Sequence, residues 1–256
     1  MKAVILAGGF GTRISEESQS RPKPMIEIGG RPILWHIMKY FSEYGVKDFV
    51  ILGGYKIEII RRYFLEYKLL NSDFIVSYDR REVDILSGCK EDWRVTIIDS
   101  GLDAMTGGRL LSAKAILEGE SDFFFTYGDG LSNIDLHAEL AYHHSHGKLA
   151  TLAAVRPPER FGRLSLEEDG LVSNFAEKPE NTDTYVNGGF FILKPGVFDL
   201  IESAKTSWEK EPLNNLSKLG QLMAFRHDGF WRPMDTLKDK NDLENMWADE
   251  PAWKVW

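Results

Sequence analysis

The chain of 256 residues contains only one cysteine, Cys89, so an intrachain disulfide is excluded. The absence of disulfides is typical of a reducing compartment, and we expect a cytoplasmic protein. Long apolar runs are missing as well. The run at residues 3–7 ends at Gly8, too early for the core of a signal peptide. No stretch approaches the roughly 20 apolar residues that cross a bilayer, so we expect no membrane partner.

Positive charge is also scarce. The chain has 31 Lys and Arg against 39 Asp and Glu, which gives a net charge of −8. A general nucleic-acid binder needs a basic surface, so this balance argues against a nucleic-acid partner. It does not argue against a nucleotide, because a few cations gathered at one site are enough to bind one.

What the sequence does contain is a short apolar strand that runs into a glycine-rich, basic loop. The strand at residues 2–7 is followed by Gly8-Gly9-Phe10-Gly11-Thr12-Arg13, and Arg21-Pro22-Lys23-Pro24 comes soon after. Glycines allow backbone N–H groups to approach an anion closely, and the nearby cations add positive charge. The combination favours a nucleoside triphosphate site, whereas a glycine pair alone would more often mark a sharp turn.

Two better-known phosphate loops do not fit this segment. A Walker loop ends in Gly-Lys-Ser/Thr, which is absent here. A dinucleotide loop reads Gly-x-Gly-x-x-Gly, and Ile14 stands at its third glycine. A nicotinamide dehydrogenase is therefore only a weak alternative.

Helical and strand patterns alternate through the first 155 residues. We expect strands at residues 46–52, 122–127 and 149–155, and helices at residues 33–44, 56–67 and 135–146. This alternation predicts the α/β class: a Rossmann-like, mostly parallel mixed sheet flanked by helices. Residues 73–100 depart from the pattern. Ile75, Val76, Val83, Ile85, Val95 and Ile97 are spaced like hairpin strands, so we expect a β-hairpin insertion there.

Two loops follow predicted parallel strands and so point to the same edge of the sheet. Gly8 follows the first strand, and Gly128-Asp129 follows the strand at residues 122–127. Asp129 lies between two glycines, which suits either a metal ligand or a turn residue. Asp235 is far away in the sequence, and by pattern alone it reads best as a helix N-cap before Leu237.

Several segments together carry a resemblance to one enzyme family. They are Leu6–Arg13 with Lys23-Pro24-Met25, residues 28–38, Met105-Thr106-Gly107-Gly108-Arg109-Leu110, Tyr127-Gly128-Asp129-Gly130, Glu177-Lys178-Pro179, Asn187-Gly188-Gly189, and residues 229–236. In this order and over nearly the whole chain, they resemble the sugar-phosphate nucleotidyltransferases. The family joins a sugar 1-phosphate to a nucleoside triphosphate.

The resemblance implies roles for individual residues. It implies Arg13, Lys23 and Asp129 as catalytic residues, and Asp129 with Asp235 as ligands of Mg²⁺. The implied nucleotide-binding residues are Leu6, Ala7, Gly8, Gly9, Gly11, Thr12, Arg13, Lys23, Thr106, Gly107, Arg109 and Gly128. The implied sugar-phosphate residues are Gly162, Glu177, Lys178 and Asn187. For Arg109, the sequence leaves open whether it meets the base or a phosphate.

The resemblance also implies a single domain over residues 1–256. Residues 1–155 would mainly bind the nucleotide, and residues 156–256 would form a smaller portion for sugar binding and oligomerisation. The segments at residues 73–100, 105–108 and 231–235 favour transfer of a cytidylyl group from CTP to glucose 1-phosphate. A homohexamer that serves CDP-deoxysugar, O-antigen and lipopolysaccharide synthesis is implied too. Thymidylyl or uridylyl transfer and a non-catalytic nucleotide-sugar-binding subunit remain as alternatives.

Two groups of residues have simpler interpretations. His143, His144 and His146 lie near the end of a predicted helix. His143 and His146 have the spacing of metal ligands, but no adjacent acid completes a site, so we expect the three histidines on a solvated helix face. Trp231, Trp247, Trp253 and Trp256 gather in the tail. They suit either a subunit contact or a tail folded onto its own core, and the sequence favours neither.

Overall fold

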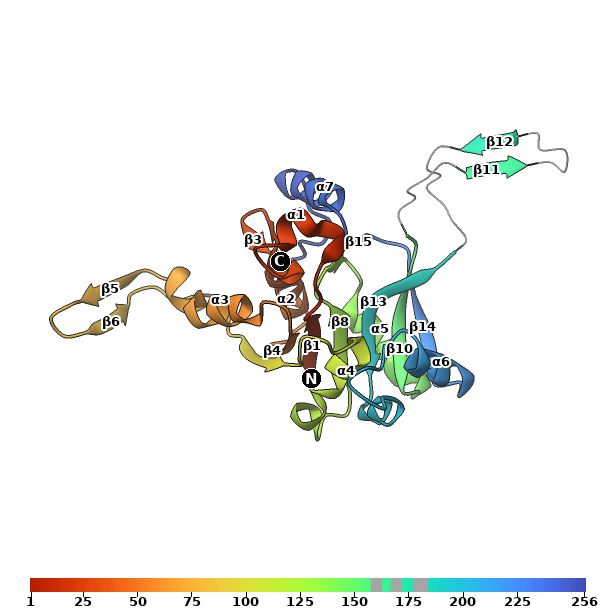
Figure 1. Ribbon diagram of the computed structural model, residues 1–256, viewed down its shortest axis with the longest axis horizontal. Helices are drawn as coiled ribbons and strands as arrows, with labels where there is room; N and C mark the ends of the chain where they lie inside the picture. The colour runs from red at the N-terminus through yellow and green to blue at the C-terminus, as the bar shows by residue number, and fades with distance from the viewer. Residues whose placement is uncertain (158–162, 167–171, 177–183) are drawn as a thin grey trace.

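A computed structural model of the chain describes residues 1–157, 163–166, 172–176 and 184–256. Its centre is a seven-stranded sheet in the order β14-β10-β13-β8-β1-β4-β7 (Figure 1). In chain order these strands are β1 Lys2–Ala7, β4 Asp48–Gly53, β7 Arg94–Asp99, β8 Phe123–Tyr127, β10 Ala150–Val155, β13 Val186–Leu193 and β14 Leu222–His227. All neighbouring pairs are parallel except those of β13, which runs antiparallel to both β8 and β10. The predicted α/β class and mostly parallel sheet are confirmed.

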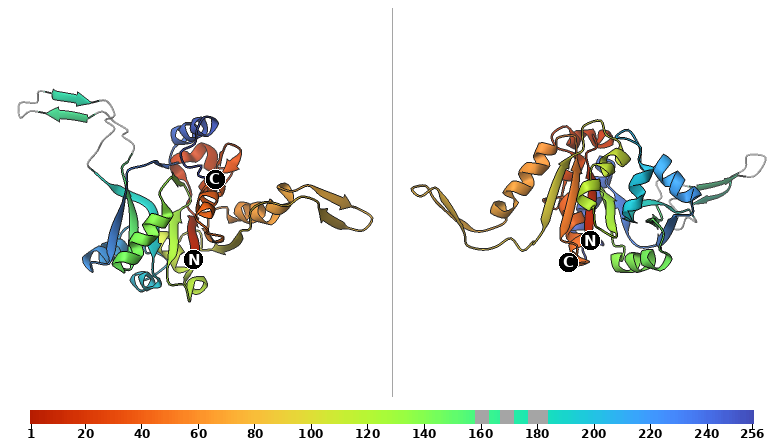
Figure 2. Two further views of the ribbon diagram at one scale, coloured as in Figure 1. Left: turned by 180° about the vertical axis from the view of Figure 1, so that it is seen from behind. Right: turned by 90° about the horizontal axis from the view of Figure 1, so that it is seen from below.

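Helices cover both faces of this sheet (Figure 2). The helices of the described chain are α1 Ser15–Ser18, α2 Ile33–Glu43, α3 Ile57–Leu70, α4 Thr106–Leu111, α5 Leu136–His146, α6 Glu211–Lys218 and α7 Leu237–Ala248, of which α1 and α7 lie at one end of the sheet (Figure 1). Short 3-10 turns lie at η1 Thr12–Ile14, η2 Lys23–Met25, η3 Lys114–Leu117 and η4 Pro195–Leu200. Four small two-stranded pairs complete the described chain: β2 Glu27–Ile28 with β3 Arg31–Pro32, β5 Phe74–Ser77 with β6 Glu82–Ile85, β9 Gly130–Ser132 with β15 Trp231–Pro233, and β11 Arg163–Leu166 with β12 Val172–Ala176.

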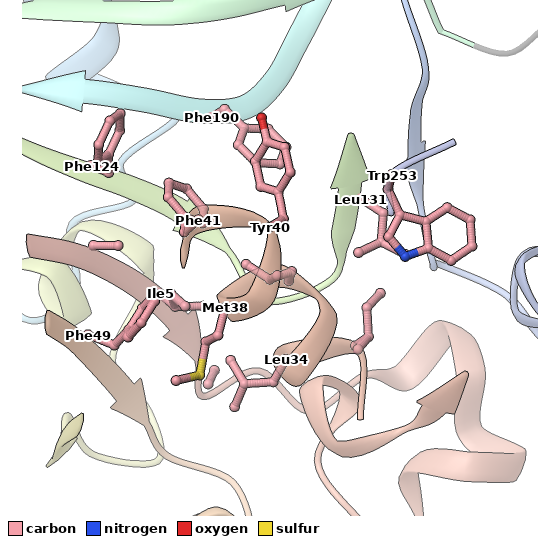
Figure 3. Packing of buried hydrophobic residues seen from close by; sticks show 14 of the residues in the cluster. Ile5, Leu34, Met38, Tyr40, Phe41, Phe49, Phe124, Leu131, Phe190 and Trp253 are labelled. Atoms are coloured by element: carbon pink, nitrogen blue, oxygen red, sulfur yellow. The ribbon is translucent and has the colours of Figure 1, made fainter. Parts of the chain in front are cut away.

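Alternate residues of β1 point into two separate cores, as the pleat of a strand requires. Ile5 belongs to the cluster under α2, together with Leu34 and Phe41 (Figure 3). Val4 belongs to the cluster on the other face, together with Leu110 of α4. Because both faces of β1 are buried, its sequence is an unbroken apolar run.

The predicted insertion is a hairpin, but a shorter one than the sequence indicated. Strands β5 and β6 pair antiparallel and extend away from the body of the molecule (Figure 1). Val95 and Ile97 are not part of this hairpin. They lie in β7, which pairs parallel with β4 as an edge strand of the main sheet. The prediction was wrong there because the spacing of Val95 and Ile97 by two residues is common to all strands, so it does not distinguish an edge strand of the main sheet from a hairpin strand.

The C-terminal tail folds back onto its own core. Trp253 is fully buried, and its ring stacks on Phe230 and on Trp247. Trp256 packs edge-on against Trp35 of α2. The structure therefore decides between the two interpretations of these tryptophans in favour of intrachain packing.

The expectation of a solvated histidine face on α5 was wrong for His143, whereas His144 is exposed. His143 is fully buried, with Nδ1 2.8 Å from Oγ1 of Thr151 and Nε2 3.2 Å from Oδ1 of Asp122. His146 also contacts Thr151 Oγ1, at 2.8 Å. Burial lowers the pKa of His143 to about 4. The neutral ring therefore donates to Asp122 and accepts from Thr151, and the cluster is a packed polar network.

Within the part of the chain that the structure describes, we find no helix with the length and apolarity needed to cross a bilayer.

Candidate active site

The glycine-rich loop begins where β1 ends, at the carboxyl edge of the sheet. Gly11 has φ +65, a left-handed conformation that favours glycine, and it starts the turn η1. Gly9 has nothing within 4 Å of the position of a β-carbon, so its backbone faces open space. The loop after β8 is tied to the same place, because Gly128 N donates to Leu6 O at 2.9 Å. The sequence predicted that the loops after β1 and β8 lie at the same edge of the sheet, and they do meet there.

A cavity of about 590 Å³ opens at this edge. Its lining includes Leu6, Ala7, Gly8, Gly9, Gly11, Thr12, Arg13, Lys23, Thr106, Arg109, Gly128, Asp129 and Asp235. Of the residues predicted to bind the nucleotide, Gly107 is missing from this lining. Met105, from one of the segments that carry the resemblance, lines the cavity too, and so do residues 102–104 and Lys205, which the sequence did not single out.

Lys23 joins the two aspartates that come from distant parts of the chain. Its Nζ lies 2.6 Å from Oδ2 of Asp129 and 2.7 Å from Oδ1 of Asp235. Arg13 Nη1 lies 2.8 Å from the other oxygen of Asp235. Burial lowers the pKa of Lys23, but the two carboxylates outweigh burial and hold the pKa above its usual value. Lys23 therefore stays charged at the base of the cavity.

Asp235 does not cap the following helix, although its position next to Leu237 suggested this. The N-cap of α7 is Thr236, whose side chain accepts from Asp239 N, and Asp239 returns the bond in a capping box. Because Thr236 caps the helix, the Asp235 carboxylate can turn to Lys23 and Arg13.

The two aspartates form a pair of carboxylates that can bind a cation. Both converge on one ammonium nitrogen, and carboxylates are the side chains with which Mg²⁺ is bound beside phosphates. Among the described residues, no group of three or more His, Cys, Asp or Glu side chains is placed to hold a metal ion. A metal here would therefore need further ligands from a substrate or from water.

Arg109 lies against Gly8 and is hydrogen-bonded to the loop at residues 100–102. Its buried guanidinium donates to Gly101 O and to Ser100 Oγ, each at 2.8 Å, and to Leu102 O at 3.1 Å. Burial lowers the pKa of Arg109. With its donors directed at the 100–102 loop, Arg109 orders the wall of the cavity and brings positive charge beneath Gly8.

The glycines of α4 serve packing. A β-carbon on Gly108 would lie 2.1 Å from Ala204 O, and one on Gly107 would lie 2.8 Å from Thr206 O. Because these glycines have no side chain, the backbone of residues 204–208 can pack directly against the start of α4. Gly107, which the resemblance implied as a nucleotide-binding residue, is buried under this segment.

A second cavity, of about 360 Å³, adjoins the first. Arg13, Tyr127, Asp129 and Asp235 line both cavities, and Asn187, Glu209 and Trp231 line the second alone. Of the predicted sugar-phosphate residues, Asn187 is thus placed beside the first cavity. Gly162, Glu177 and Lys178 lie outside the described residues.

Sequence reasoning missed Tyr127 and Glu209. Tyr127 OH donates to Glu209 Oε1 at 2.6 Å, and burial with the Glu209 charge raises the pKa of Tyr127 above its usual range. Tyr127 directly precedes Gly128-Asp129, so its place at a strand end could have drawn attention to it. Glu209 has no such local pattern, because only the fold brings it to this edge.

The comparisons with known proteins agree with this geometry. Residues 2–232 match the family model described as nucleotidyl transferase. The chain is 50% identical over 257 residues to the glucose-1-phosphate cytidylyltransferase of Salmonella typhi, and 45% identical over 258 residues to the probable glucose-1-phosphate cytidylyltransferase of Bacillus subtilis. Both alignments cover all of this chain and all of the relative. The crystal structure of HddC from Yersinia pseudotuberculosis has a TM-score of 0.70 at 23% identity, over 96% of this chain and 99% of that one, which supports the fold alone.

Proposed function

This chain belongs to the nucleotidyl transferase family, and we propose that it transfers a cytidylyl group from CTP to glucose 1-phosphate, giving CDP-glucose and pyrophosphate. The observation that carries the proposal is the full-length identity of 45–50% to two proteins that bear the name of this activity. The cavity at the glycine loop adds physical support, because it gathers the cations that a triphosphate needs.

In this reaction an oxygen of the sugar phosphate attacks the α-phosphorus of CTP. A new P–O bond forms while the bond to the β-phosphate breaks, and pyrophosphate leaves with that electron pair. The attacking group is already an anion, so no protein nucleophile is required. The protein contributes position and charge. Backbone N–H groups of the glycine loop face the phosphates, and Arg13 and Lys23 offset the negative charge that gathers between them.

Asp129 and Asp235 are the residues that would hold Mg²⁺. Their carboxylates lie close enough to contact a single cation, as their shared contact with Lys23 indicates. When bound, the ion would neutralise phosphate charge and polarise the α-phosphate. The sugar phosphate would lie in the adjoining cavity beside Asn187, and Gly162, Glu177 and Lys178 would complete its site.

The experiment is pyrophosphate release with glucose 1-phosphate, Mg²⁺ and each of CTP, UTP, dTTP, ATP and GTP, followed by mass spectrometry of the product. Release with CTP and a CDP-hexose product supports the proposal. A preference for UTP or dTTP would replace it with uridylyl or thymidylyl transfer. Tight CTP binding without pyrophosphate release would favour the binding-subunit alternative, against which the joint presence of Lys23, Asp129 and Asp235 argues.

We further propose a cytoplasmic homohexamer that supplies CDP-glucose for CDP-deoxysugars of O-antigen and lipopolysaccharide. The projecting hairpin supports self-association, because Phe74, Ile75 and Val83 expose between 44% and 50% of their surface. Exposed apolar side chains in such number are typical of a contact surface. Light scattering tests the assembly, and a monomeric mass would reject it.

A further inference from the structure

Glu209 is held in place by the segment that crosses the start of α4. Met105 N donates to Ala204 O at 2.9 Å, and Trp208 N donates to Thr106 Oγ1 at 2.9 Å. These bonds fix the chain on both sides of the contact. The Glu209 side chain therefore starts from a backbone position that is set relative to α4, and it lines the second cavity beside Tyr127, which lines both cavities.

The Glu209 carboxylate accepts hydrogen bonds from three side-chain hydroxyls. Tyr127 OH lies 2.6 Å from Oε1, while Thr106 Oγ1 and Ser207 Oγ lie 2.6 and 2.9 Å from Oε2. An ionised carboxylate can only accept hydrogen bonds. Each of these hydroxyls must therefore give its proton to Glu209.

This assignment fixes what Thr106 can offer to a ligand. A hydroxyl has one proton and two lone pairs. The proton of Thr106 goes to Glu209, and one lone pair accepts from Trp208 N. One lone pair remains on a side chain that lines the larger cavity. Toward a ligand, Thr106 is thus an acceptor and not a donor.

The base is the part of the nucleotide expected near Thr106. Phosphates are drawn to Arg13 and Lys23, which lie at the Asp235 end of the lining. This leaves the wall formed by residues 102–106 as the place for the uncharged base. Cytosine carries an amino donor at the ring position where uracil and thymine carry a carbonyl acceptor. A hydroxyl that can only accept forms a hydrogen bond with the amino group of cytosine and not with the carbonyl group of uracil or thymine.

We propose that Glu209 is a positioning residue for base choice: by taking the proton of Thr106, it presents this hydroxyl as an acceptor that selects a base with an amino group. The inference rests on the proposed function and adds the reason for its preference for CTP. Ser207 strengthens the arrangement, because its bond to the same carboxylate oxygen keeps Oε2 turned toward α4.

The test compares kcat/KM for CTP with kcat/KM for UTP at saturating glucose 1-phosphate. In Thr106→Val and in Glu209→Gln, the ratio of the two should fall by about tenfold, the effect of losing one ligand hydrogen bond. The glutamine amide can donate to Thr106, which releases the hydroxyl proton toward the cavity. If UTP is not turned over, its inhibition constant against CTP provides the same ratio.

Two further variants separate base choice from general damage. Tyr127→Phe removes another bond to Glu209 but leaves Thr106 in place, so it should keep the CTP:UTP ratio. Glu202→Gln changes an exposed glutamate outside both cavities and should keep both rates. If Glu209→Gln fails to fold, Glu209→Asp takes its place, because the shorter side chain draws the carboxylate away from Thr106 Oγ1 and keeps its charge, and the ratio should fall in this variant too.

The outcomes are distinguishable. A wild-type enzyme that prefers CTP, with an unchanged ratio in either Thr106→Val or Glu209→Gln, overturns the inference and leaves the proposed function standing. Equal losses for CTP and UTP would show a merely structural role and overturn it too. A wild-type protein without CTP turnover overturns the proposed function, and the inference falls with it.

Discussion

Arg109 occupies the space that a side chain at Gly8 would need. A β-carbon on Gly8 would lie 2.2 Å from Nη1 of Arg109, well inside van der Waals contact. The same nitrogen would lie 2.3 Å from a β-carbon on Gly54. A side chain at the first glycine of the loop would therefore have to displace a buried, hydrogen-bonded arginine, whereas Gly11 has a positive φ that favours glycine.

We expect Gly8→Ala to displace Arg109 and to disturb the 100–102 loop. Overpacking of this kind costs about 1–3 kcal/mol in the free energy of unfolding, which urea denaturation can measure. Gly9→Ala is the matched control for stability, because its β-carbon would meet nothing within 4 Å. Equal losses of stability in the two variants would contradict the steric explanation.

Lys23→Gln should abolish most of the turnover while leaving the fold intact. The variant removes the ammonium between Asp129 and Asp235, and with it the charge that offsets the phosphates. Loss of one such electrostatic contact lowers kcat by about 10²–10³-fold. Pyrophosphate release measures the effect, with the surface variant Lys218→Gln as control. Turnover near the wild-type rate in Lys23→Gln would remove Lys23 from the catalytic residues.

Removal of divalent metal with EDTA should stop pyrophosphate release, and added Mg²⁺ should restore it. In Asp235→Asn, we expect half-maximal activity to require about tenfold more Mg²⁺, because an amide oxygen is a weaker ligand than a carboxylate. Asp249→Asn, at the exposed end of α7, should keep the wild-type Mg²⁺ requirement. An unchanged requirement in Asp235→Asn would exclude this residue as a metal ligand.

Glu139 should make the protein less stable as the pH rises. It is fully buried on α5, neither carboxyl oxygen has a hydrogen-bond partner within the described chain, and burial raises its pKa from 4.5 to about 8. The folded protein keeps the proton that the unfolded chain loses above pH 4.5, so stability falls between about pH 4.5 and 8. At pH 7 the penalty is at most about 3 kcal/mol.

Glu139→Gln removes this titration and keeps the shape of the side chain. The difference in unfolding free energy between variant and wild type should therefore change steadily between pH 5 and 8 and level off above pH 8. Urea denaturation over this range measures it, with the exposed Glu118→Gln as control. Parallel pH curves for Glu139→Gln and wild type would show that Glu139 is not protonated in the fold.

The elements that the sequence predicted well are those with a strong local pattern. The helix α2 follows Pro32, has a clear apolar face and ends before Gly45, whose φ is +80. The prediction went wrong where two structures share one pattern, as with Val95 and Ile97 in the edge strand β7. The prediction for the histidines of α5 failed for another reason: their partners Asp122 and Thr151 lie outside α5 and are not visible in its local sequence pattern.

By itself, the sequence determined the α/β alternation, the glycine loop after β1 and the meeting of Gly8 with Asp129 at one edge, because each follows from local periodicity and from the direction of parallel strands. Only the tertiary structure decided that Lys23 joins Asp129 to Asp235, that Arg109 lies under Gly8 and that Glu209 takes the proton of Thr106. These contacts join residues up to 212 positions apart. No local pattern encodes such pairings, because they depend on how the whole chain packs around the sheet.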